Sequence, residues 1–129
     1  MSEESEARAE IYRQILDLAG TVLEGLEHIH RKAGEGNLDQ TRELYADVTA
    51  SFHEIKKGLL AHYPGFNGSE MEGRMQKVAE QMDFLVLAYE GDEAARPVEI
   101  LQLTLLPAYR RWQESLHEAL GEHCRSTYH

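Results

Sequence analysis

The sequence has few residues that could cross-link it and no segment that could anchor it in a membrane. Cys124 is the single cysteine among 129 residues, so no internal disulfide can form, which is typical of a reducing cytoplasm. No apolar run approaches the roughly 20 residues that a membrane-spanning helix needs. The first residues, Met-Ser-Glu-Glu-Ser-Glu, are acidic and polar, unlike a signal or transit peptide. We therefore expect a cytoplasmic protein without a membrane partner.

Positive charge is also scarce. Aspartate and glutamate number 23 against 13 lysines and arginines, which gives a formal net charge of −10. No run of basic residues is longer than pairs such as Arg31-Lys32 and Arg110-Arg111. Because a net negative field repels phosphate groups, we expect no nucleic-acid partner.

The alternation of apolar and polar residues that marks β-strands is absent, and the apolar residues recur instead at helical spacing. The spacing predicts four helices, over residues 4–32, 38–62, 70–90 and 97–122. Their connections are short, so neighbouring helices should be antiparallel. We therefore predict one all-α domain over residues 1–129, an up-down-up-down four-helix bundle.

Individual residues refine these predicted helices. Asn37 suits the N-cap of the second helix, and Ser69 with Glu72 forms a capping-box pattern for the third. Pro107 lies inside the apolar pattern of the fourth, where it should kink the helix near Leu103 or divide it in two.

The apolar stripe of the third helix is rich in methionine. Met71, Met75 and Met82 share it with Val78, Val86 and Tyr89. Thioether side chains fill irregular cores, but they also suit surfaces that bind varied helices. The sequence alone leaves both interpretations open.

Two Glu-x-x-His pairs, Glu27 with His30 and Glu114 with His117, have the spacing that bundle proteins use for metal ions. A ligand set must converge on the interior of the bundle. At ~100° per residue, both glutamates lie away from the apolar stripes of their helices. We therefore expect no metal and no cofactor.

Arg111 and His117 offer a second enzymatic alternative. Some helical ribonucleases place an arginine and a histidine four to six residues apart on a late helix, and this pair resembles that arrangement. The following residue, Trp112, differs from the small polar residue of that family, and the net charge opposes RNA binding. We therefore expect no enzymatic activity.

Several apolar residues lie off the stripes of the third and fourth helices. In straight helices these side chains should point away from the core and meet at one end of the hairpin. The alternative is that a kink at Pro107 buries some of them. The predicted partner-binding patch consists of Phe84, Leu87, Ile100, Leu103 and Leu106.

Three segments carry a resemblance to known proteins. They read G-L-E-H-I-H in the first helix, L-Y-A-D-V-T-A-S-F-H-E-I-K-K-G-L-L in the second and L-P-A-Y-R-R-W in the fourth. The chain resembles small uncharacterised helical proteins of bacteria. It is also similar in general build to flagellar secretion chaperones, small acidic bundles that wrap a partner's helix. The resemblance implies a function in protein binding and transfers no site residue.

The sequence thus predicts a non-enzymatic protein–protein interaction module, an adaptor or chaperone-like bundle. The expected partner is another protein or a second copy of the chain, as a homodimer at micromolar concentration. The alternatives are a metal-binding or enzymatic bundle using the Glu/His pairs and a ribonuclease-like bundle using Arg111 and His117.

Overall fold

A computed structural model describes residues 3–126, and these residues form helices and connecting turns without a strand. The long helices are α1 (Glu3–Gly34), α2 (Arg42–His62), α3 (Glu70–Glu90) and α5 (Leu106–Ser126). Three short elements accompany them: a 3-10 turn, η1 (Leu38–Thr41), a helix, α4 (Ala95–Glu99), and a π-helical stretch, η2 (Ile100–Leu105).

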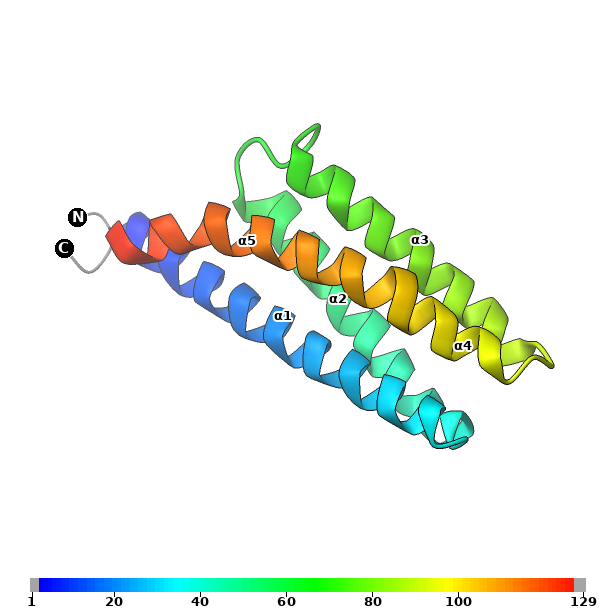
Figure 1. Cartoon of the computed structure of the whole chain (residues 1–129). Helices are drawn as coiled ribbons and strands as arrows, with labels where there is room; N and C mark the ends of the chain where they lie inside the picture. Colours follow the sequence, from blue (N-terminus) through cyan, green and yellow to red (C-terminus); the bar gives the residue numbers. More distant parts are fainter. Residues whose placement is uncertain (1–2, 127–129) are drawn as a thin grey trace.

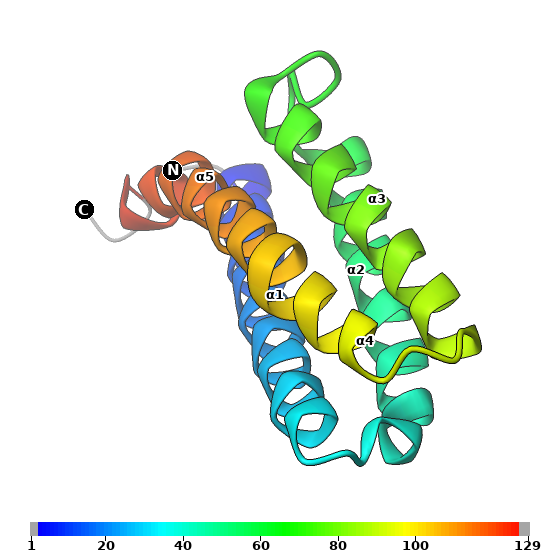
Figure 2. The same ribbon diagram turned by 45° about the vertical axis from the view of Figure 1, so that its right-hand side comes forward.

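The helices form the predicted antiparallel bundle. α1 packs against α2 and α5, and α3 packs against α5 and η2. α4, η2 and α5 join into one continuous helix, the fourth rod of the bundle (Figure 1). Successive rods run in opposite directions (Figure 2), so α1 begins at the end of the bundle where α5 finishes.

The predicted caps are only partly confirmed. The Ser69 Oγ accepts the Glu72 backbone N–H at 3.1 Å, but the Glu72 carboxylate accepts the N–H of Gly68 at 2.8 Å, one residue earlier than in a standard capping box. The Asn37 side chain makes no cap hydrogen bond, so that prediction was wrong. The turn η1 lies between Asn37 and α2, and α2 consequently begins at Arg42.

The methionine stripe belongs to the core. Met71, Met75 and Met82 are all buried, whereas Val86, which was placed on the same stripe, is exposed. Trp112 is fully buried. Its ring lies 5.2 Å from that of Phe52, measured between centroids.

Pro107 does not divide the fourth helix, and the distortion predicted near Leu103 is present as a π-helical stretch. The distortion precedes Pro107, in η2, where hydrogen bonds reach five residues back, as the Leu106 N–H does to the Leu101 carbonyl. The Thr104 hydroxyl donates a further bond of 2.7 Å to the Ile100 carbonyl. A wider turn can absorb the clash and the missing donor that a proline imposes on an α-helix.

The same π-helical stretch corrects two predicted patch residues. Ile100 and Leu106 are buried, with 7% and 3% of their surface exposed. Because the backbone hydrogen bonds of a π-helix reach five residues back, residues that are five apart lie next to each other along the helix. Ile100 with Leu105, and Leu101 with Leu106, therefore both face the interior. The prediction assumed a uniform α-helical rotation and placed Ile100 and Leu106 on the wrong side.

Candidate functional site

Three predicted patch residues remain at the surface and form an apolar groove between the end of α3 and the start of the fourth rod. Phe84, Leu87 and Leu103 are 50%, 62% and 68% exposed. Five large apolar side chains are exposed among the described residues, and these are three of them. Their concentration on one seam distinguishes this surface from the rest of the bundle.

Two adjoining hollows give this groove its shape. The larger, of about 420 Å³, is lined by Phe84, Leu87, Ala88 and Ile100 together with the turn that follows α3. The second, of about 240 Å³, shares Phe84 and Ile100 and extends along η2 to Leu103. Ile100 contributes to both hollows although it is nearly buried, so it forms the floor rather than the rim.

Charged side chains surround the apolar centre. Asp92, Glu93 and Arg96 line the larger hollow, and Glu99 lines the smaller. Arg96 approaches Glu99 at 3.9 Å, an exposed ion pair of small energetic value. The groove therefore has an apolar centre and a mainly acidic end.

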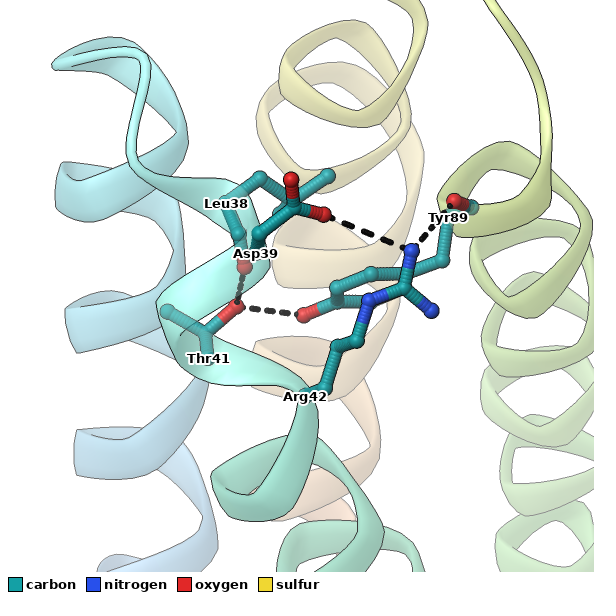
Figure 3. Close-up of polar contacts among 5 residues, drawn as sticks. All are labelled: Leu38, Asp39, Thr41, Arg42 and Tyr89. Carbon is teal, nitrogen blue, oxygen red and sulfur yellow. Dashed lines mark hydrogen bonds and ion pairs between the residues drawn. The ribbon is translucent and has the colours of Figure 1, made fainter.

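A second surface feature lies where the turn η1 meets the end of α3 (Figure 3). The Arg42 guanidinium donates to the Tyr89 carbonyl at 3.0 Å, lies 3.3 Å from the Asp39 carboxylate and stands 5.5 Å from the centre of the Tyr89 ring. The buried Thr41 hydroxyl donates to the Leu38 carbonyl at 2.5 Å and bonds the Tyr89 hydroxyl at 2.7 Å.

These polar groups connect neighbouring elements of the bundle. Burial raises the pKa of Tyr89, and the hydrogen bond with Thr41 and the charge of Arg42 only partly offset that rise. The Tyr45 ring stacks on that of Tyr89 at 5.3 Å, and its hydroxyl donates to the Met82 carbonyl at 2.6 Å. With their hydroxyls engaged, both tyrosines serve to fasten α3 to α2 and η1.

Sequence reasoning missed this cluster. Thr41 is the one buried polar residue among those described, and a single threonine before a helix gives no periodic signal. A neighbouring hollow of about 270 Å³, between Arg42, Tyr45, Val86 and Tyr89, was missed for the same reason. Only the placement of Tyr89 on the methionine-rich stripe of the third helix pointed toward it.

The Glu/His pairs do not converge on a common centre. The Glu27 carboxylate lies 3.8 Å from the Arg110 guanidinium, which links α1 to α5 at the surface. Glu114 and His117 are both exposed on α5. Within residues that the structure describes, no three histidine, cysteine, aspartate or glutamate side chains gather as a metal site would require.

Arg111 and His117 are likewise not brought together in one hollow. The Arg111 side chain lines a hollow between α3 and α5 with Arg74, Lys77 and Ala108, and His117 is not part of that lining. In that hollow Arg111 takes part in a cluster of three cations with Arg74 and Lys77.

The fold and the groove define a class: a four-helix bundle whose most distinctive surface is an apolar seam between its third and fourth rods. The chain belongs to the family of a domain of unknown function (DUF8042), whose model matches residues 10–115. No curated protein and no solved structure matches the chain. No helix within residues 3–126 is long and apolar enough to cross a membrane.

Proposed function

We propose that this protein is a non-enzymatic interaction module, an adaptor or chaperone-like bundle that binds a protein through the groove of Phe84, Leu87 and Leu103. The observation that carries the proposal is the exposure of these three side chains on one seam. Contiguous apolar surface of this kind is uncommon on monomers and usually marks an interaction site.

The packing of the helices behind the groove supports the same proposal. Leu101 and Leu105 bury the inner side of the fourth rod in the core, and Met82 and Leu85 do so for α3. The exposed side chains are therefore held by elements whose opposite faces are packed. A preorganised apolar surface loses less entropy on binding than one that must first be ordered.

The proposed role agrees with the general build of flagellar secretion chaperones, although the family match names no partner. A helix or a second bundle could cover the groove, since both present apolar stripes of suitable width. The single cysteine favours the cytoplasm as the compartment in which this binding takes place.

A matched set of variants tests the proposal. Leu87→Glu and Leu103→Glu place charge in the groove, and Leu60→Glu is the control because Leu60 is also an exposed leucine, 49%, but lies on α2. In pull-downs from the native host followed by mass spectrometry, wild type and Leu60→Glu should retain a common protein that the groove variants lose.

Circular dichroism should show all three variants to be as helical as wild type, since none of the changed side chains is buried. The captured protein could be the endogenous chain itself, which would identify self-association. Capture that does not depend on Leu87 and Leu103, or the absence of any enriched protein, would contradict the proposed site.

A further inference from the structure

The seam between α3 and the fourth rod carries opposite charges at its two ends. At one end Arg74, Lys77 and Arg111 line a hollow of about 290 Å³ with Ala108. Arg74 is fixed there by the Ser115 hydroxyl at 2.6 Å and by the Glu70 carboxylate at 2.7 Å. Within the described part of the chain, Lys77 and Arg111 have no ion-pair partner. On a chain of net charge −10, this basic hollow is locally unbalanced.

The other end of the seam is acidic. Asp92 and Glu93 follow directly after α3 and line the apolar groove, and neither forms an ion pair within residues 3–126. Glu99 adds a third carboxylate beside the single cation Arg96. We call Asp92, Glu93 and Glu99 the acidic rim.

The apolar groove lies at a similar distance from the basic hollow and from the acidic rim. Lys77 precedes Phe84 by seven residues on α3, about 10 Å at 1.5 Å per residue. α3 ends at Glu90, about 9 Å beyond Phe84, and the acidic rim begins there. The order along the seam is therefore basic, apolar and acidic, with the apolar part near the middle.

We infer that a second copy of this chain covers the seam, packed about a two-fold axis that passes near Phe84 and Leu103 with the two α3 helices antiparallel. This inference rests on the proposed function and identifies its partner. A two-fold interface must complement itself, because each contact between two surfaces occurs twice.

Only the antiparallel arrangement satisfies that condition here. It places apolar groove on apolar groove and sets the basic hollow of each copy against the acidic rim of the other. A parallel arrangement would place like charges together, which is costly at an interface. The unpaired state of Lys77, Arg111, Asp92 and Glu93 within one copy is explained if their partners lie in the second.

Two charge-reversal variants test the arrangement. Variant A carries Lys77→Glu and Arg111→Glu, and variant B carries Asp92→Lys and Glu93→Lys. Each should dimerise at least about tenfold more weakly than wild type, because each homodimer would contain two repulsive contacts. Mixed in equal amounts, A and B should form a heterodimer, since both charge contacts between them become attractive again. Sedimentation velocity with one variant fluorescently labelled measures each species.

A second measurement uses the unmodified protein. If charge sets the register, raising the salt from about 50 mM to about 500 mM should weaken the wild-type dimer, since salt screens exposed charges. Variants A and B should keep the wild-type circular dichroism spectrum, because the changed side chains are exposed.

Each outcome has a defined meaning. Wild-type protein that is still monomeric at about 100 micromolar, roughly 100-fold above the concentration at which we expect dimers, would overturn the dimer. Variants that dimerise as well as wild type, or fail to pair when mixed, would overturn the charge register. None of these results would affect partner capture that depends on Leu87 and Leu103, so the proposed interaction site could still hold.

Discussion

Trp112 is the largest side chain that the bundle buries completely. It meets Phe52 and Tyr109 in edge-to-face contacts, with ring centroids 5.2 and 5.1 Å apart. Its indole N–H has no hydrogen-bond partner among the described residues. Tyr109, by contrast, donates its hydroxyl to the Ala19 carbonyl at 2.6 Å. Trp112 therefore contributes through apolar packing and carries the cost of an unpaired donor.

We predict that Trp112→Ala lowers the free energy of unfolding by ~3–5 kcal/mol, the usual cost of emptying a large buried site. Trp112→Phe should cost clearly less, since it keeps an aromatic ring among Phe52 and Tyr109 and removes the unpaired N–H. Urea unfolding of the three proteins measures both values. A loss below about 1 kcal/mol for the alanine variant, the size typical of surface sites, would contradict burial of the tryptophan.

At the scale of elements, one close contact between α1 and α2 depends on a glycine. A β-carbon built on Gly25 would lie 2.7 Å from the Cγ2 of Val48, closer than carbon atoms pack. Gly20 lies on the same helix and has nothing within 4 Å of the equivalent position. The two glycines therefore form a matched pair in which only one is required by packing.

We predict opposite effects for alanine at these positions. Gly20→Ala should stabilise the protein by up to about 1 kcal/mol through helix propensity. Gly25→Ala should destabilise it by ~1–3 kcal/mol, because overpacking outweighs that gain. Adding Val48→Ala should relieve the clash, so the double variant should lose less than the two single losses combined. Thermal unfolding measures all four variants, and equal effects of Gly20→Ala and Gly25→Ala would contradict the close contact.

Of the four rods, helix periodicity was sufficient to predict α3 at 70–90, α1 to within two residues, and α2 except that the turn η1 takes up its first four residues. It was not sufficient for the fourth, because the method assumes one rotation per residue and η2 departs from it. The sequence does contain the explanation: adjacent apolar pairs, Ile100-Leu101 and Leu105-Leu106, repeat at a spacing of five before Pro107. A straight α-helix would not bury both pairs on one side, whereas a π-helical stretch does.

For the whole molecule, the sequence could indicate the apolar groove but not the charged residues that surround it. Phe84, Leu87 and Leu103 depart from the apolar periodicity of their own helices, so each can be recognised from the sequence of that helix alone. The basic hollow depends on how α3 and α5 meet: Arg74 and Lys77 become neighbours of Arg111 only after folding. Contacts between helices carry no signal in one sequence, and for the same reason the Thr41–Tyr89 hydrogen bond was not predicted.

The stability of the whole bundle should also respond to alkaline pH through its buried tyrosines. Burial raises the pKa of Tyr45, Tyr89 and Tyr109 in the folded protein above the value of about 10 for an exposed phenol. Because the pKa is raised in the folded state, the contribution of each buried tyrosine to the free energy of unfolding is fully present below about pH 10. It is lost as the pH rises further. Above that pH the unfolded chain releases phenolic protons that the folded bundle retains.

We therefore predict that the free energy of unfolding falls from about pH 10 upward, by as much as ~1.4 kcal/mol per pH unit for each of the three tyrosines. Urea unfolding between about pH 8 and about pH 11 measures the slope, and phenolate absorbance follows the titration itself. Tyr109→Phe loses the bond to the Ala19 carbonyl and should be less stable at neutral pH. Above about pH 10 the stability of Tyr109→Phe should nevertheless fall less steeply with pH, by the contribution of one tyrosine. This difference distinguishes the tyrosines from the lysines, which titrate in the same pH range. An identical slope in the two proteins would show that Tyr109 ionises as freely in the folded bundle as in the unfolded chain.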